Sequence, residues 1–307
     1  MELYDIIIVG GGPAGLTASI YAVRANMKTL VLDKLAPGGQ IINTNEIANY
    51  TGVGVINGAE LAIKMYEHSQ QAGAAFDYKT VTRIEDKGAY KLVYCEEENT
   101  VLQARAVIIA TGTRPRRLGV TGEEAHAGGG ISWCAICDGT QYEGRDVVVI
   151  GGGNSAVEES LYLAGIVNKL TIVTMFGLTA DPEACDKLRA LPNVTVHPYQ
   201  QVLEFMGEDR LTGVRFASTK DGEERIVTCD GVFEYIGFAP TAGFCAELGI
   251  LDNTGCVSVD AHMRTRLAGV FAAGDITDKF LRQVITACGD GAIAANSAAK
   301  YVENLRG

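Results

Sequence analysis

Two cysteines separated by two residues, Cys134 and Cys137, carry the sharpest chemical signal in this chain. That spacing lets both sulfur atoms approach within bonding reach at the start of a helix. A helix N-terminus lowers the pKa of a thiol and favours the thiolate, which is the attacking form. Asp138 follows the pair and is a candidate acid–base group for moving thiol protons. The segment therefore predicts a redox-active disulfide.

Two other interpretations of the pair are half of a zinc site and two buried structural thiols. A structural zinc site needs further ligands at close spacing, and the sequence has no second Cys-x-x-Cys and no Cys/His pair to supply them. The four histidines also lack ligand spacing, so we expect no metal. The remaining cysteines stand alone, and we expect them to be small buried hydrophobic residues: Cys95, Cys185, Cys229, Cys245, Cys256 and Cys288.

A glycine-rich turn near the N-terminus is the second candidate site. Gly10, Gly12 and Gly15 occupy the positions of the G-x-G-x-x-G pattern, directly after an apolar run. Such glycines let a pyrophosphate approach the N-terminus of the following helix, whose N–H groups and dipole favour anions. Asp33 ends the next predicted strand, where a carboxylate can accept hydrogen bonds from ribose hydroxyls. The alternative is a tight turn without a ligand.

The elements around these sites form a β-α-β pattern that occurs twice. Apolar runs rich in Ile and Val are typical of central parallel strands. The first unit is a strand at 5–9, a turn at 10–15, a helix through Arg24 and a strand at 29–33. The second is a strand at 146–150, a turn at 151–153, a helix through Ala164 and a strand at 170–174. Two such units predict two nucleotide-binding-type domains rather than a solenoid.

The C-terminal part of the chain predicts that one domain is inserted into the other. A buried strand at 106–112 precedes one linker candidate, and 237–241 is another. The tail then returns to a strand at 270–273 and an Ala-rich helix. We therefore predict an α/β fold with two Rossmann-like, three-layer ββα domains. The first comprises residues 1–115 and 243–307, and the inserted one comprises 116–242 and carries the cysteine pair.

Composition and charge exclude several classes of protein. The net charge is −11 and the isoelectric point is about 4.9, which argues against nucleic-acid binding and against an anionic membrane surface. No apolar stretch is long enough for a transmembrane helix, and the N-terminus lacks the pattern of a signal peptide. Scattered single thiols fit a reducing compartment. We therefore expect a cytoplasmic protein.

Over nearly its whole length the chain resembles the low-molecular-weight thioredoxin reductase family. The combination is specific, because the Cys-x-x-Cys-Asp-Gly segment lies just before the second glycine-rich turn. The matching segments are GGGPAG at 10–15, GGQI at 38–41, IANYTG at 47–52, ATG at 110–112, CAICDG at 134–139, GGGNSAVEE at 151–159, FAAGDITD at 271–278 and RQVITACGDG at 282–291.

The resemblance implies a homodimeric flavoprotein that reduces thioredoxin, with domains that rotate between two poses. It implies that Cys137 faces the flavin, that Cys134 attacks the disulfide of the partner and that Asp138 assists proton transfer. Together with Asp33, the residues expected to bind FAD are Gly10, Gly12, Pro13, Ala14, Gly15, Gly39, Gln40, Asn49, Thr111, Gly112, Gly274, Asp275, Arg282, Gln283 and Val284.

The chain departs from this family after the second glycine-rich turn. NADPH-using relatives carry a cluster of basic residues there to bind the 2′-phosphate, whereas residues 173–180 read VTMFGLTA and the next basic residue is Lys187. We expect Phe176 to fill the vacant pocket. In lacking these basic residues, the chain resembles the ferredoxin-dependent flavin thioredoxin reductases. NADPH is therefore a doubtful donor.

Reduced ferredoxin is therefore the expected electron donor. Ferredoxins near about −400 mV can reduce thioredoxin near about −270 mV. Because ferredoxins are commonly acidic, docking requires a local basic patch. Its candidates are Arg114, Arg116, Arg117, Lys279 and Arg282.

Three other functions stay open from the residues. One is an NAD(P)H-dependent thioredoxin reductase that makes unusual contacts to its nucleotide. Another is a flavin dithiol oxidase, which a large apolar pocket beside Cys134 would favour. The third is a non-enzymatic redox sensor in which the cysteine pair switches a partner contact.

Overall fold

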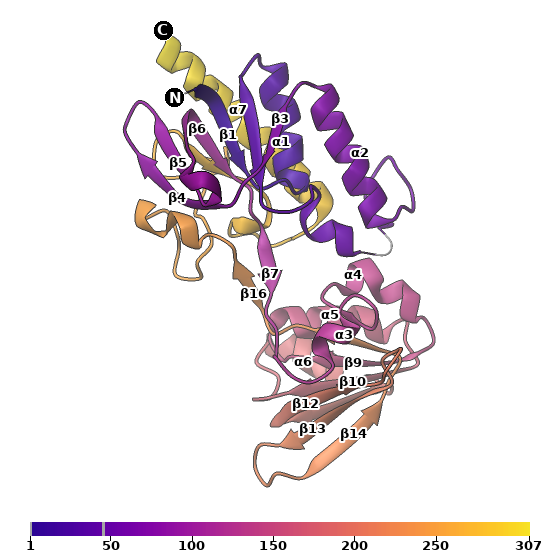
Figure 1. Cartoon of the computed structure of the whole chain (residues 1–307). Coiled ribbons are helices and arrows are strands. Elements are labelled where there is room, and N and C mark those ends of the chain that lie inside the picture. Colours follow the sequence, from indigo (N-terminus) through magenta and orange to yellow (C-terminus); the bar gives the residue numbers. More distant parts are fainter. Residues whose placement is uncertain (1, 45–46) are drawn as a thin grey trace. The chain divides into compact units, whose positions relative to one another are not determined.

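The computed structural model describes residues 2–44 and 47–307, and the chain divides into two compact units (Figure 1). Unit 1 consists of Met1–Arg114 and Ala239–Gly307, and unit 2 consists of Pro115–Phe238. Unit 2 is thus inserted into unit 1. In the described part of the chain, no helix is long and apolar enough to cross a membrane.

The second crossing between the units lies at 238/239 rather than at the predicted 242/243. Strand β7 (Thr113–Pro115) pairs with β16 (Phe238–Pro240), so the outgoing and returning segments lie side by side. Thr241 then binds unit 1, since its N–H donates to the Gly112 carbonyl at 3.1 Å and its hydroxyl to the Thr111 carbonyl at 2.6 Å. Strands of three residues are too short to show periodicity, so the sequence did not reveal this pairing.

The sheet of unit 1 has seven strands in the order β3-β2-β1-β6-β5-β4, and β17 also pairs with β6. Residues 107–109 of β6 pair in parallel with β17, whereas residues 101–104 pair antiparallel with β5. The strands are β1 (Leu3–Val9), β2 (Thr29–Asp33), β3 (Ala75–Tyr78), β4 (Val81–Asp86), β5 (Lys91–Cys95), β6 (Val101–Ile109) and β17 (Val270–Ala272).

Alternation along β1 produces the layers of unit 1. Ile6 and Ile8 face a core built with the alanines of two helices, whereas Ile7 and Val9 face a second core on the other side of the sheet. The α-helices are α1 (Pro13–Arg24), α2 (Gly58–Gln71) and α7 (Val284–Arg306). The short 3₁₀ helices are η1 (Gly39–Asn43), η2 (Glu97–Asn99), η4 (Gly243–Leu248) and η5 (Gly274–Ile276).

Helices α1 and α7 lie side by side on one face of the sheet (Figure 1). Small residues allow this close approach, because a Cβ at Gly291 would lie only 2.2 Å from the Ala14 carbonyl oxygen. The start of α7 is fixed by a capping box between Gln283 and Thr286. This packing brings the N-terminal and C-terminal parts of unit 1 together at the first glycine-rich turn.

Unit 2 repeats the same three-layer plan. Its parallel sheet has the order β11-β10-β9-β15-β8, and an antiparallel sheet has the order β12-β13-β14. Val147 and Val149 of β9 face the helical core, whereas Val148 and Ile150 face the antiparallel sheet. The strands are β8 (Ile131–Ser132), β9 (Asp146–Ile150), β10 (Lys169–Thr174), β11 (Val194–Pro198), β12 (Gln200–Met206), β13 (Gly213–Ser218), β14 (Glu224–Thr228) and β15 (Gly231–Glu234).

The helices of unit 2 are short apart from the one that follows the second glycine-rich turn. They are α3 (Glu123–His126), α4 (Ala135–Asp138), η3 (Gly139–Tyr142), α5 (Asn154–Ala164) and α6 (Pro182–Arg189). Both β-α-β repeats therefore have the predicted elements, and the predicted α/β class with two Rossmann-like units is confirmed.

Candidate functional site

The first glycine-rich turn requires glycine at two of its positions for steric reasons. Gly10 has φ +111°, and a Cβ there would lie 2.4 Å from the Ala110 carbonyl oxygen. A Cβ at Gly15 would lie 1.8 Å from the carbonyl oxygen of Gly10. Gly12, in contrast, has open space and meets only the Cα of Gly39, at 3.9 Å. The turn is therefore tight on its inner side and open above Gly12.

The open side of this turn lies at the N-terminus of α1. Gly12 is the N-cap residue and has no side chain to cap the helix, while Pro13 occupies the first helical position beside Ala14. Uncapped N–H groups and the helix dipole favour an anion at such a position. Asp33 accepts a hydrogen bond from the Gly11 N–H at 2.6 Å, which fixes the turn against the end of β2.

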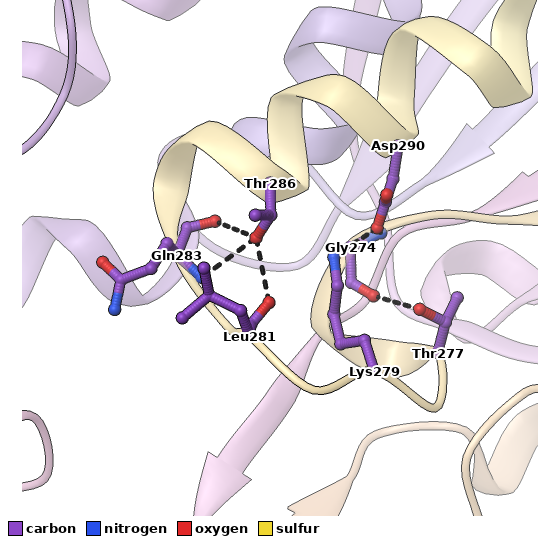
Figure 2. Close-up of polar contacts among 7 residues, drawn as sticks. All are labelled: Gly274, Thr277, Lys279, Leu281, Gln283, Thr286 and Asp290. Carbon is purple, nitrogen blue, oxygen red and sulfur yellow. Dashed lines mark hydrogen bonds and ion pairs between the residues drawn. The ribbon is translucent and has the colours of Figure 1, made fainter. Parts of the chain in front are cut away.

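The C-terminal segment meets the same turn in unit 1. Gly274 has φ +78°, and a Cβ there would lie 2.8 Å from the Cβ of Ala14. Figure 2 shows that the Gly274 N–H and the Lys279 ammonium both reach the carboxylate of Asp290 on α7. The Gly274 carbonyl accepts a bond from the Thr277 hydroxyl at 2.8 Å. These contacts hold the segment that carries Asp275 beside α1.

Asp275 is a half-buried acid with a buried, unused oxygen. Its Oδ1 has no hydrogen-bond partner among the described residues. Burial raises the pKa of this carboxyl, while the charges of Lys279 and Arg282 oppose the rise. A buried polar atom of this kind is normally satisfied by a ligand or by water. The open glycine turn and this unused oxygen fit a dinucleotide such as FAD.

The other residues predicted to bind FAD also lie in unit 1. Asn49 Nδ2 donates to Gln283 Oε1 at 3.0 Å, which joins two segments that are distant in the sequence. Val284 begins α7, where the Thr286 hydroxyl binds the backbone of Gln283 and Leu281 (Figure 2). Thr111 binds the Thr241 carbonyl through its hydroxyl at 2.8 Å, and Gly112 follows it with φ +64°. Gln40, in η1, is exposed.

In unit 2, Cys134 and Cys137 form a disulfide with a Cα–Cα distance of 5.3 Å. Cys134 is the N-cap residue of α4, and its sulfur accepts a hydrogen bond from the Cys137 N–H at 3.2 Å. Ser132 donates to Asp138 Oδ2 at 2.5 Å and accepts from the Cys134 N–H at 3.2 Å. Ser132, which sequence reasoning missed, therefore connects the predicted acid–base residue to the backbone of the predicted nucleophile.

Helix α4 is also held from two neighbouring elements. The Ala135 N–H donates to the Tyr235 hydroxyl at 2.8 Å and to Glu159 Oε2 at 3.0 Å. The Tyr235 hydroxyl donates to the same Glu159 oxygen at 3.2 Å. Burial raises the pKa of both Glu159 and Tyr235. The disulfide is thus attached to the end of β15 and to α5, the helix of the second glycine-rich turn.

A cavity of about 370 Å³ lies over the second glycine-rich turn. Gly151 to Gly153 form one wall, and the end of β10 with Met175 and Phe176 forms another. The loop after β10 folds back onto the turn, where the Thr179 N–H donates to the Gly152 carbonyl at 2.7 Å. The prediction that Phe176 fills the pocket is wrong, because this residue is 73% exposed and only lines the open cavity.

The cavity is lined by glycines and by apolar and neutral polar side chains. Thr174, Thr179, Gln200 and Tyr235 supply its polar groups, and none of its lining residues is charged. A 2′-phosphate therefore meets no cation among them, as residues 173–180 predict. The predicted basic patch is also reduced, because Lys279 forms an ion pair with Asp290 and its side chain is only 13% exposed.

Comparison with known proteins decides the family. The profile of the pyridine nucleotide-disulphide oxidoreductases matches residues 4–291. A thioredoxin reductase from Listeria monocytogenes is 42% identical over 99% of this chain and 96% of its own length. The chain belongs to the thioredoxin reductase family. It is a flavoprotein disulfide oxidoreductase, and the family implies FAD as its cofactor.

Solved thioredoxin reductases agree with this assignment. The structure from Streptococcus pyogenes is 41% identical, covers 98% of this chain and 99% of its own chain, and superposes with a TM-score of 0.92. A ferredoxin-flavin thioredoxin reductase from Clostridium acetobutylicum is 28% identical, with a TM-score of 0.56 over 100% of this chain and 99% of its own. The similarity is thus greater to the former than to the ferredoxin branch predicted from the sequence. The family is enzymatic, so the non-enzymatic sensor is not supported.

Proposed function

We propose that this enzyme reduces the disulfide of thioredoxin, using electrons that pass from a reduced pyridine nucleotide through FAD to Cys134 and Cys137. The observation that carries the proposal is the formed disulfide at the N-cap of α4. It lies in the same unit as a dinucleotide-type turn with an open cavity. Relatives named thioredoxin reductase, at 41–42% identity over nearly the whole chain, support this substrate.

The cysteines act by thiol–disulfide exchange. The Cys134 thiolate attacks one sulfur of thioredoxin, forms a mixed disulfide and releases the other sulfur as a thiolate. Cys137 then attacks the sulfur of Cys134, which restores the enzyme disulfide and releases thioredoxin as a dithiol. The two protons that thioredoxin gains come from the two enzyme thiols, and Asp138, oriented by Ser132, is the group proposed to carry them.

FAD is proposed to bind at the first glycine-rich turn of unit 1. When bound, it accepts electrons from the donor and supplies two of them to the disulfide. The helix N-terminus at Gly12 and Pro13 is suited to the pyrophosphate, and Asp33 to ribose hydroxyls. Asp275 has a buried oxygen left to satisfy, and Asn49 and Gln283 hold the two distant segments together.

The proposed donor is a pyridine nucleotide rather than the ferredoxin expected from the sequence. The cavity over Gly151 to Gly153 is open, and the loop after β10 does not fill it. Because no cation lines this cavity, the extra phosphate of NADPH gains no charge-assisted hydrogen bond there. We therefore expect NADH to serve at least as well as NADPH.

Reduced ferredoxin is the second candidate donor. The observation that favours it is the same absence of charged residues around the cavity, since ferredoxin needs no nicotinamide site. Against it stand the open cavity, the ion-paired Lys279 and the greater similarity to the Streptococcus pyogenes enzyme.

Anaerobic stopped-flow bleaching of the flavin distinguishes the donors. The oxidised enzyme is mixed in turn with NADH, NADPH and reduced ferredoxin at micromolar concentration. We expect rapid bleaching by NADH, and bleaching by NADPH that is no faster. Bleaching by ferredoxin alone would reject the nucleotide donor, and a clear preference for NADPH would show that a cation outside the lining residues binds the 2′-phosphate.

Two further expectations complete the proposal. A homodimer is proposed from the family resemblance, and light scattering of the purified protein measures it directly. A cytoplasmic location is proposed because the other six cysteines are unpaired and buried, which suits a reducing compartment.

A flavin dithiol oxidase is the other function that the sequence left open. Such an enzyme would consume oxygen with a small dithiol and would not need thioredoxin.

A further inference from the structure

The residue before the nucleophile is the only tryptophan of the chain, Trp133. Its indole N–H donates to Glu234 Oε2 at 2.9 Å. The guanidinium of Arg117 lies 4.1 Å from the centroid of its ring, which is the distance of a cation–π contact. The ring that precedes Cys134 is therefore held by a carboxyl group at its edge and by a cation over its face.

Glu234 is an unusual acceptor because it is almost completely buried. It is 2% exposed, and the neighbouring acid Glu123 is 3% exposed. Glu123 is itself anchored, since its two oxygens accept the N–H groups of Leu118 at 2.9 Å and Gly119 at 2.6 Å. Two buried carboxyl groups thus interact directly, and one of them holds the tryptophan.

The groups around Glu234 hold its pKa near neutrality. Burial and the charge of Glu123 raise the pKa of Glu234 to about 7, while the Trp133 N–H and the charge of Arg117 oppose the rise. Glu123 lies in α3, Arg117 lies in the segment before α3, and Trp133 directly follows β8. Glu234 therefore changes charge within the working range of a cellular enzyme.

The next residue of the chain holds the other neighbour of Cys134. Tyr235 accepts the Ala135 N–H at 2.8 Å, and Glu159 on α5 supports this contact. Consecutive residues of an extended chain point to opposite sides, so Glu234 and Tyr235 reach the two flanks of Cys134 separately. The end of β15 consequently fixes Trp133 and Ala135, the residues on either side of the nucleophile.

We propose that Glu234 is a positioning residue for Cys134: its buried carboxyl group fixes the Trp133 ring, and the ionised carboxylate holds this ring more tightly and speeds attack on the thioredoxin disulfide. The proposal rests on the proposed function. An ionised carboxylate accepts a shorter and stronger hydrogen bond than a neutral carboxyl, so the ring is held more firmly above the pKa.

Two variants of Glu234 separate position from charge. Glu234→Gln keeps an acceptor for the indole N–H but cannot ionise, and Glu234→Leu removes the acceptor. Glu224→Gln, an exposed glutamate of β14 in the same unit, is the matched control. Each enzyme is reduced beforehand with stoichiometric dithionite and separated from excess, so that the donor plays no part in the measured step.

The first readout is the fluorescence of Trp133 between pH 5.5 and 8.5. We expect the wild type and Glu224→Gln to titrate with a midpoint near 7, and Glu234→Gln to show no such transition. The second readout is the rate of thioredoxin reduction, taken as the ratio of wild type to Glu234→Gln, because this ratio cancels the ionisation of Cys134. It is expected to be about 1 at pH 5.5 and about 3 or more at pH 8.5.

Glu234→Leu completes the test at a single pH. We expect it to retain the flavin spectrum and to reduce thioredoxin about tenfold more slowly than Glu234→Gln. A rate ratio that does not change with pH, or equal rates for the Leu and Gln variants, would overturn the proposal. If the wild type fails to reduce thioredoxin, the proposed function fails instead, and the same ratios with 5,5′-dithiobis(2-nitrobenzoate) still decide the role of Glu234.

Discussion

Cys134 and Cys137 occupy unequal positions, and we propose that this inequality underlies different roles. Cys134 precedes α4 as its N-cap, and its sulfur accepts the Cys137 N–H at 3.2 Å, whereas Cys137 lies inside the helix. After reduction, the same N–H can stabilise a thiolate on Cys134. We therefore propose Cys134 as the nucleophile toward thioredoxin, as the family resemblance also implies.

Single cysteine variants test this assignment. Cys137→Ser leaves Cys134 able to attack but removes the thiol that resolves the mixed disulfide, so we expect a stable covalent complex with thioredoxin. Cys134→Ser should form little of it, and both variants should lose turnover. Mass spectrometry under non-reducing conditions measures the complex. Equal trapping by the two variants would contradict the unequal roles.

Glu234 makes the stability of unit 2 depend on pH. Its pKa rises from the ordinary 4.5 to about 7 on folding, so the folded state binds more protons between these values. The resulting stabilisation of about 3 kcal/mol is fully present below pH 4.5 and is lost as the pH rises through 7.

Denaturant unfolding followed by Trp133 fluorescence checks this pH dependence, because the only tryptophan lies in unit 2. Between pH 5 and pH 8, we expect the free energy of unfolding to fall by about 2.5 kcal/mol more for the wild type than for Glu234→Gln. Equal pH dependence of the two proteins would show that Glu234 is already ionised at pH 5.

Among the elements, the parallel strands and their glycine-rich turns were the most predictable. Apolar runs such as 5–9 and 146–150 stand out because central strands are buried on both faces. The contacts around α4 were not predictable, since Ala135 and Tyr235 are 100 residues apart and the sequence carries no sign of their hydrogen bond. The open cavity beside Phe176 depends on how the loop after β10 folds, which composition does not fix.

Gly15 and Gly12 of the first turn provide a matched pair of positions for substitution, one crowded and one open. A Cβ at Gly15 would lie 1.8 Å from the Gly10 carbonyl oxygen, whereas a Cβ at Gly12 meets nothing closer than 3.9 Å. We expect Gly15→Ala to lower the melting temperature of the apoprotein by several degrees. Gly12→Ala should leave it unchanged but weaken FAD binding at least tenfold, because the methyl group enters the open side of the turn.

Calorimetry of the apoproteins and flavin titration measure these two effects separately. Unchanged FAD affinity in Gly12→Ala would show that the cofactor does not approach this side of the turn. An unchanged melting temperature in Gly15→Ala would show that the turn relaxes around the added methyl group.

In the whole molecule, the two units repeat one architecture and divide the chemistry between them. Unit 1 carries the turn and the C-terminal segment proposed for FAD, and unit 2 carries the disulfide and the second turn. The sequence predicted this division because both repeats and the cysteine pair are local patterns. The missing basic residues favoured ferredoxin as the donor because they indicated an unused site, whereas the open cavity leads us to propose a pyridine nucleotide instead.

We propose that electrons leave this enzyme through Cys134 and Cys137 to thioredoxin. The most direct test of this route is an anaerobic experiment in which two equivalents of NADH first reduce both the flavin and the disulfide, and oxidised thioredoxin is then added in excess. We predict that the flavin absorbance near 450 nm returns as two thioredoxin dithiols form per chain, and that the Cys134→Ser variant stays bleached. A bleached wild-type enzyme that does not respond to thioredoxin, or a Cys134→Ser variant that recovers as fast as the wild type, would rule out this route for the electrons.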